Sequence, residues 1–89
     1  MTVCKRVYYS GRVQGVGFRY AAQSLAEDFD VSGYVRNLPG GDVELVAEGR
    51  VEQVDAFLDT VARRMAGHIE RTTVREESPG GYKGFRIRY

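Results

Sequence analysis

The 89-residue sequence has only one cysteine, Cys4, only one histidine, His68, and no tryptophan. With a single cysteine, no disulfide can form within the chain, whereas secreted domains of this size usually depend on several. The N-terminal residues also lack the apolar run of a signal peptide. No zinc-binding pattern and no Cys-x-x-Cys pair of a metal chaperone is present. We therefore expect a protein of a reducing, cytoplasmic compartment with no metal and no cofactor.

Long hydrophobic runs and a strong net charge are absent as well. No uncharged stretch approaches the roughly 20 apolar residues that span a bilayer. Thirteen basic and twelve acidic side chains give a net charge of +1, whereas general nucleic-acid binders are commonly far more basic. We therefore expect no membrane and no nucleic-acid partner. The length leaves room for one domain, residues 1–89.

Glycine, by contrast, is abundant, with 11 residues against two prolines. Glycine loses more backbone entropy on folding than any other residue, so its positions are informative. Two Pro-Gly-Gly segments, at 39–41 and 79–81, have the composition of turns. Gly15 and Gly17 instead lie in the segment Gln14-Gly15-Val16-Gly17-Phe18-Arg19, between an expected strand and an expected helix.

The hydrophobic periodicity predicts seven elements. Apolar residues alternate in four segments and recur at helical spacing in two, and a further segment, 69–77, is rich in β-forming residues through Thr72, Thr73 and Val74. The expected strands cover residues 3–13, 31–37, 43–49, 69–77 and 85–89, and the expected helices cover 18–28 and 51–66. This βαββαβ order is that of the ferredoxin-like α+β fold, a sandwich with two helices on one face of a mostly antiparallel sheet. The last short strand is additional and is expected at the edge of the sheet.

The segment from Gly15 to Arg19 has the chemistry of an anion-binding loop. Glycines permit positive φ angles that let successive N–H groups converge, and the free N–H groups at a helix start add partial positive charge. Arg19 falls in the first helical turn, where a cation costs about 0.3–1 kcal/mol unless an anion is bound. These residues alone allow two interpretations, a phosphate or carboxylate site and an ordinary turn with a solvated arginine. The loop lacks the Gly-Lys-Ser/Thr ending of a P-loop and does not indicate ATP or GTP.

Asn37 is expected beside this loop. In the predicted fold the first two strands run parallel, so the second strand ends where the glycine-rich loop begins. An asparagine side chain offers both a donor and an acceptor, which suits binding of a water or a substrate oxygen. Asparagine also commonly satisfies the backbone of a turn, and both roles stay open.

Three segments together resemble a known family. Gly11-Arg12-Val13-Gln14-Gly15-Val16-Gly17-Phe18-Arg19, Gly33-Tyr34-Val35-Arg36-Asn37 and Gly41-Asp42-Val43-Glu44-Leu45-Val46-Ala47-Glu48-Gly49 closely resemble the acylphosphatases. The resemblance extends over essentially the whole chain, and the separate motifs have the expected spacing. Together they are far more specific than the glycine-rich loop alone.

The resemblance implies hydrolysis of the carboxyl–phosphate bond of a small acyl phosphate, without a metal, to a carboxylate and inorganic phosphate. By motif, Asn37 would position the attacking water. The phosphoryl oxygens would be held by the Arg19 side chain and by the backbone N–H groups of Gly15, Val16, Gly17, Phe18 and Arg19. Inorganic phosphate or sulfate is then the expected competing anion, and the chain is expected to act as a monomer. The alternative is a non-catalytic anion-binding or regulatory domain on the same fold.

Three positions depart from the common pattern of this family. Leu38 follows the asparagine where many members have a small hydroxylated residue, Tyr34 replaces a common tryptophan, and Gly17 stands at an often aromatic position. Leu38 removes a hydrogen-bonding group next to Asn37, which is expected to alter the rate or the orientation of Asn37.

Four further residues have simple interpretations. His68 is expected at the site end of the sheet, either as a proton relay or as a surface-loop histidine. Cys4 is expected to be a small packing residue. Tyr8 and Tyr9 suggest base stacking as in RNA-recognition motifs. The expected third strand has none of the basic and aromatic residues of that module, so we reject RNA binding.

Overall fold

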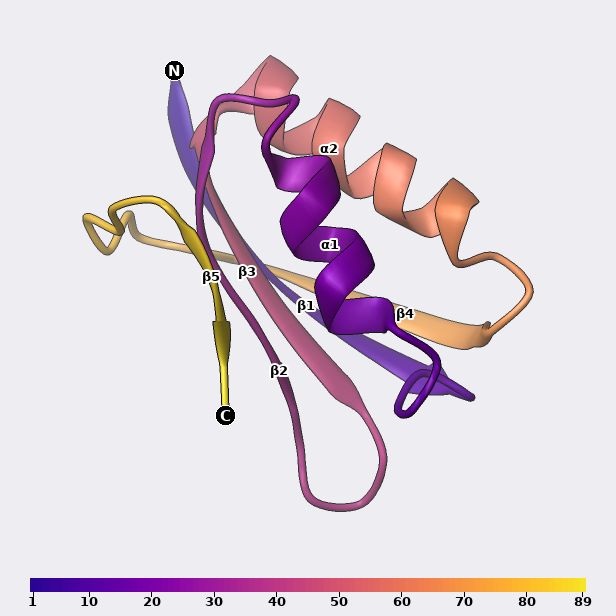
Figure 1. The fold of residues 1–89 in the computed structure, drawn as a ribbon. Helices are drawn as coiled ribbons and strands as arrows, with labels where there is room; N and C mark the ends of the chain where they lie inside the picture. The colour runs from indigo at the N-terminus through magenta and orange to yellow at the C-terminus, as the bar shows by residue number, and fades with distance from the viewer.

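Five strands form one sheet, and two helices lie side by side on one of its faces (Figure 1). The computed structural model describes all residues, 1–89. The elements in chain order are β1 (Thr2–Gly11), α1 (Phe18–Ala26), β2 (Val31–Asn37), β3 (Val43–Arg50), α2 (Val51–Arg64), β4 (Ile69–Glu77) and β5 (Phe85–Arg88). The predicted order of elements and the ferredoxin-like α+β class are confirmed.

The strand order of the sheet is β4-β1-β3-β2-β5. All neighbouring strands are antiparallel except β2 and β5, and the predicted edge position of β5 is confirmed. Strands β1 and β2 both pair with β3 antiparallel and are therefore parallel to each other. Tyr9 of β1 and Asn37 of β2 pair with the same residue, Val43. The β1–α1 loop and the β2–β3 turn consequently lie at the same end of the sheet (Figure 1).

The main core lies between the helices and the sheet. Helix α2 contributes Val54, Phe57 and Val61, each fully buried, and helix α1 contributes Phe18 and Ala22. Fully burying a large apolar side chain stabilises the fold by about 1.5–3 kcal/mol, so these two stripes hold the helices on the sheet. The aromatic rings of Phe18 and Tyr9 are 4.9 Å apart. This contact anchors the start of α1 to the end of β1, directly beside the glycine-rich loop.

Both helices end earlier than the periodicity predicts. Helix α1 ends at Ala26 instead of residue 28, because the next N–H groups donate to carbonyls three residues back, as from Asp28 to Leu25 at 3.0 Å. Phe29 lies beyond the helix but still packs on Phe57, with ring centroids 5.9 Å apart. Its helical spacing from Leu25 therefore reflects packing on the core and not membership of the helix. Helix α2 ends at Arg64, two residues before the expected end. Neither helix is long and apolar enough to cross a membrane.

The first strand also ends earlier than expected, at Gly11 and not at residue 13. The pairing of β1 with β4 shifts register between Ser10 and Gly11, and the strand ends at the next paired residue, Gly11. Val13 lies beyond it but is 1% exposed, because the loop folds back onto the core. On the other face of the sheet, Cys4 packs with Tyr34 and Val46 and is also 1% exposed, which confirms its expected packing role.

Candidate functional site

The loop between β1 and α1 has a backbone that requires glycine at two positions. Gly15 and Gly17 have φ angles of 75° and 78°, in the left-handed region that L side chains rarely adopt. A Cβ atom at either position would meet no atom within 4 Å. The conformation of the loop, and not a lack of space, therefore calls for glycine. Gly17 is also the N-cap of α1 and provides no side-chain cap for the helix.

The backbone N–H groups of residues 15–19 have no acceptor within the protein. The first helical bond at this end runs from the N–H of Ala21 to the carbonyl oxygen of Gly17, at 2.9 Å. None of the N–H groups of residues 15–19 donates a hydrogen bond to a backbone or side-chain atom of the chain. Five consecutive free donors at the positive end of a helix favour a bound anion.

Arg19 is the nearest cation to these donors, in the first turn of α1. It forms no ion pair, in contrast to Lys5, Arg6 and Arg36, which each pair with a carboxylate. Its guanidinium carbon lies 5.1 Å from the ring centroid of Tyr89, a distance typical of cation–π contacts. The positive charge of Arg19 thus contacts an aromatic ring and is not neutralised by a carboxylate.

Tyr89, the last residue, also contacts helix α1. A hydrogen bond with Tyr20 raises the pKa of the Tyr89 hydroxyl, and the charge of Arg19 acts in the opposite direction. The proximity of this last residue to Arg19 was not predicted, because no local sequence pattern connects residues 70 positions apart. Both tyrosines are exposed.

Asn37 lies at the end of β2, at the same end of the sheet as the loop. Its Oδ1 atom is buried and has no hydrogen-bond partner, the only buried side-chain nitrogen or oxygen of the protein in that state. An unsatisfied buried acceptor costs about 1–3 kcal/mol. The side chain therefore does not serve the turn backbone through Oδ1, and it is free to accept a hydrogen bond from a ligand or a water.

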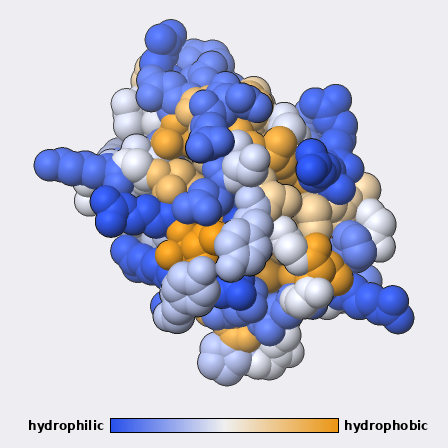
Figure 2. Space-filling view, in the orientation of Figure 1, coloured by the Kyte–Doolittle hydropathy of each residue, from blue (hydrophilic) through white to orange (hydrophobic).

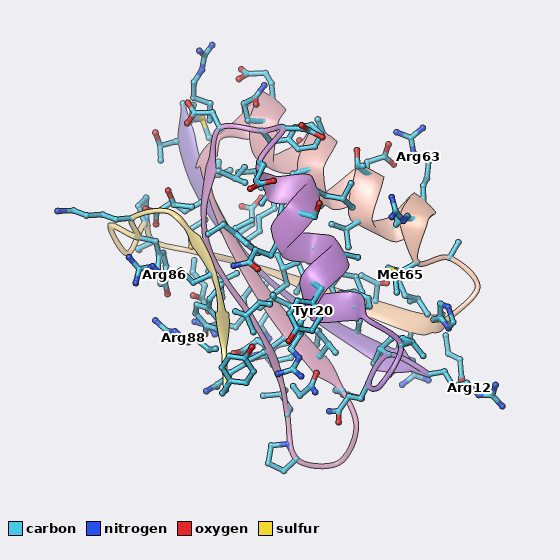
Figure 3. All side chains as sticks on the ribbon, in the orientation of Figure 1. Arg12, Tyr20, Arg63, Met65, Arg86 and Arg88 are labelled. Carbon is cyan, nitrogen blue, oxygen red and sulfur yellow. The ribbon has the colours of Figure 1, made fainter.

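These groups line one cavity of about 250 Å³. The lining residues are Val13, Gly15, Gly17, Phe18, Arg19, Tyr20 and Asn37. Of the residues predicted to bind the phosphoryl group or the water, only Val16 is not among them, and its side chain is exposed. Arg12, although close in sequence, extends away from the molecule into solvent (Figure 3). The structure thus brings an unpaired cation, free N–H donors and an unsatisfied amide oxygen to one place.

Gln14 connects the two segments that form the cavity, a role that sequence reasoning missed. Its Nε2 donates to the carbonyl oxygens of Leu38 and Asp42, at 2.8 and 2.9 Å. The N–H of Leu38 also donates to Asp42, at 2.8 Å. The acceptors are backbone carbonyls, which every residue has, so the sequence carries no signal for this contact.

Two other residues lie outside the cavity. His68 does not line it, and its carbonyl oxygen accepts a hydrogen bond from the N–H of Arg12 at 2.9 Å. This position agrees with the loop interpretation and not with a proton relay. Tyr34, one of the three departures, lies on the face of the sheet opposite the helices, where its hydroxyl donates to Glu44 at 2.9 Å. Tyr34 therefore does not line the cavity, although it differs from the tryptophan that is common in the family.

Comparisons with known proteins agree with this geometry. The family model named Acylphosphatase matches residues 5–87. The acylphosphatase of Methanospirillum hungatei is 46% identical over 81 residues, which cover 89% of each chain. A crystal structure of acylphosphatase from Bacillus subtilis superposes with a TM-score of 0.87 at 34% identity and full coverage of both chains. An acylphosphatase structure from Coxiella burnetii gives a TM-score of 0.85 at 32% identity, covering 98% of this chain and 93% of that one.

These matches extend over nearly the whole chain, at both the sequence and the structural level. The matched residues, 5–87, include the glycine-rich loop, Arg19 and Asn37 of this chain. The chain therefore belongs to the acylphosphatase family, whose members are hydrolases.

Proposed function

We propose that the cavity of about 250 Å³ binds the phosphoryl group of an acyl phosphate. Family membership makes the chain an acyl phosphate hydrolase, and the proposal concerns which residues perform the reaction. Arg19 and the N–H groups of Gly15, Val16, Gly17, Phe18 and Arg19 hold the phosphoryl oxygens, and Asn37 positions the water. The observation that carries this division is the meeting of five free N–H donors with an unpaired arginine in one loop.

The loop supplies charge stabilisation. In phosphoryl transfer, negative charge spreads over the three peripheral oxygens of the transferred group while the attacking and leaving oxygens lie roughly in line. Donors that are already fixed by the fold need no reorganisation when this charge develops. The left-handed glycines set the direction of the N–H groups in this way, and the guanidinium of Arg19 lies beside them in contact with the ring of Tyr89.

Asn37 orients the nucleophile. Its buried Oδ1 accepts a hydrogen bond from the water, whose oxygen then forms a bond to phosphorus while the bond between phosphorus and the acyl oxygen breaks. The electron pair of the broken bond leaves with the carboxylate, and the proton of the water passes to a phosphate oxygen of the substrate. A carboxylate is a good leaving group, so a general acid is dispensable. A pH–rate profile that revealed an essential enzyme base would contradict this proton path.

Two substitutions test the assignment. Arg19→Ala should raise the inhibition constant for inorganic phosphate about 10- to 100-fold, because a charge-assisted hydrogen bond is lost. It should lower kcat/KM by roughly 10³-fold, as loss of a fixed donor to the developing charge does. Asn37→Ala should lower kcat about 10²- to 10³-fold and leave the inhibition constant for phosphate near that of the wild type. Steady-state kinetics with benzoyl phosphate, with and without added phosphate, measure both constants.

Arg12→Ala is the matched control, because it removes an arginine seven positions earlier that points into solvent. It should retain wild-type kinetics. Near-wild-type turnover in either site variant would contradict the assignment. The alternative, a non-catalytic anion-binding domain, predicts phosphate binding without hydrolysis in the wild-type protein.

The same proposal covers the conditions under which the chain acts. We expect turnover to persist in excess EDTA, sulfate to compete as phosphate does, and the protein to act as a cytoplasmic monomer. The small number of large hydrophobic side chains that are exposed supports a monomer: Met1, Val16, Tyr20, Val74 and Tyr89. Loss of activity in EDTA that added metal restores would contradict the first of these expectations.

A further inference from the structure

A second and larger cavity adjoins the phosphate cavity. It has a volume of about 340 Å³ and lies between helix α1 and the first residues of β2 and β5. Tyr20 lines both cavities and forms the wall between them. Its side chain is 63% exposed, so the wall is an open edge and not a closed partition. We call this second cavity the α1 groove.

The α1 groove begins at the site and runs along the helix. Tyr20, Gln23 and Ser24 of α1 line it together with the C-cap residue Glu27, at the spacing i, i+3, i+4 and i+7 of one helix face. Seven residues of helix correspond to about 10 Å, so the groove is long enough for an acyl group of several carbon atoms.

The floor of the groove is apolar. Val31, at the start of β2, and Phe85, at the start of β5, line it from the sheet. Hydrophobic residues are visible on the surface between α1 and β5 (Figure 2), and Tyr20 lies at the site end of this region (Figure 3). On the helix side the groove is mixed, with polar Gln23, Ser24 and Glu27 beside apolar Ala26 and the ring of Tyr20.

We propose that the α1 groove binds the acyl part of the substrate and selects acyl phosphates whose acyl group is apolar and uncharged, as in aryl or branched aliphatic acids. This inference rests on the proposed function of the adjoining cavity. In-line displacement requires that the leaving carboxylate departs away from the attacking water. Asn37, which positions the water, comes from β2, whereas Tyr20, which lines the α1 groove, comes from α1. The water and the acyl group can therefore bind on different sides of the phosphoryl group.

The charge of the groove sharpens this selection. Glu27 is the only charged residue among those that line it, and it lies at the end remote from Arg19. An acyl group with a carboxylate or phosphate of its own would bring a second negative charge toward Glu27. Two like charges roughly 6 Å apart in a solvated groove disfavour binding about three-fold, and salt reduces the effect.

The first test fills the groove and compares two substrates. The wild-type protein should hydrolyse benzoyl phosphate with a kcat/KM about ten-fold above that of acetyl phosphate, because a partly buried ring gains the free energy of several apolar carbon atoms. Ser24→Trp should lower this ratio at least five-fold. Gln23→Trp, on the same wall, repeats the test should the first variant fold poorly. Ala56→Trp, exposed on α2, is the matched control and should keep the wild-type ratio.

The second test changes the charge. The wild-type protein should prefer butyryl phosphate to succinyl phosphate about three-fold, since the two acyl chains have the same length and differ by one carboxylate. Glu27→Gln should abolish most of this preference. Equal hydrolysis of the two substrates by the wild-type protein, or an unchanged benzoyl-to-acetyl ratio in both tryptophan variants, would overturn the groove. The proposed function would survive those results. It would fail if no acyl phosphate were hydrolysed, or if Arg19→Ala or Asn37→Ala kept near-wild-type turnover.

Discussion

At the scale of single residues, Gln14 determines how the two halves of the site are placed relative to each other. Its side-chain amide donates to two carbonyl oxygens of the β2–β3 turn, next to Asn37. Gln14→Ala removes both hydrogen bonds, so the turn can shift relative to the glycine-rich loop. We expect kcat to fall about 10- to 100-fold, because a misplacement of about 1 Å is enough for such a loss. Steady-state kinetics would measure it.

A positioning role for Gln14 can be distinguished from a purely structural role by comparing two constants, kcat and the inhibition constant for phosphate. The phosphate-holding groups lie in the loop itself, so the inhibition constant for inorganic phosphate should change less than three-fold in Gln14→Ala. Stability should fall by about 1–2 kcal/mol, since each lost hydrogen bond is worth about 1 kcal/mol. Equal losses in phosphate binding and in turnover would contradict the positioning role.

At the scale of elements, the contact of β2 with β3 depends on Gly33. Its φ angle is 142°, and a Cβ atom there would overlap the carbonyl oxygen of Val46 on the neighbouring strand. Gly33→Ala must therefore separate two central strands as well as strain the backbone. We expect the free energy of unfolding to fall by at least about 2 kcal/mol, measured by urea denaturation.

Gly40→Ala provides the comparison for this effect. Gly40 also has a positive φ angle, 96°, but a Cβ atom there would meet nothing within 4 Å. The free energy of unfolding of this variant should fall by only about 1 kcal/mol, because alanine is strained in the left-handed backbone conformation. A similar loss in both variants would show that strand separation is not the cause.

At the scale of the whole molecule, one carboxylate joins the three central strands on the face opposite the helices. Glu44 of β3 is only 3% exposed and binds Arg6 of β1 at 3.0 Å, Arg36 of β2 at 2.7 Å and the Tyr34 hydroxyl at 2.9 Å. Burial by itself raises the pKa of Glu44, but the hydrogen bonds from Tyr34, Arg6 and Arg36 outweigh it and hold the pKa below its usual range. The ionised form therefore stabilises the fold.

The sign of this linkage predicts how stability depends on pH. The contribution is fully present above the pKa of an unfolded glutamate, about 4.3, and is lost as the pH falls toward the lower pKa of the folded state. Glu44→Gln should be about 1–3 kcal/mol less stable at pH 7, and its stability should fall less steeply than that of the wild type below pH about 4.3. Thermal unfolding between neutral and acidic pH measures both effects.

The control for this effect is a glutamate outside the network. Glu52 lies exposed on α2, where its side chain is 63% accessible. Glu52→Gln should keep the wild-type dependence on pH. A wild-type slope in Glu44→Gln would show that other carboxylates cause the loss of stability in acid.

The order of elements, and the position of the glycine-rich loop and Asn37 at the same end of the sheet, follow from the sequence alone. Apolar residues recur with periods that only strands or helices can bury on one side, and this is a local property of the chain. Once the order is βαββαβ, β1 and β2 are parallel, so the β1–α1 loop, which leads to Arg19, and Asn37 lie at the same end of the sheet. The residue type at positions 15 and 17 likewise predicts the positive φ angles of the loop, because glycine adopts them without steric cost.

Three features were decided only by the tertiary structure. The helix ends depend on where packing stops supporting the i→i−4 hydrogen bonds. Phe29 shows that apolar residues can continue at helical spacing beyond the end of a helix. The hydrogen bonds from Gln14 to the β2–β3 turn depend on backbone carbonyls, which have no sequence signature. The α1 groove needs Tyr20 and Phe85, 65 positions apart, to lie beside one cavity. The sequence specifies the chemical groups and the hydrophobic periodicity of each segment. Cavities and their walls form only when segments that are distant in the sequence pack together.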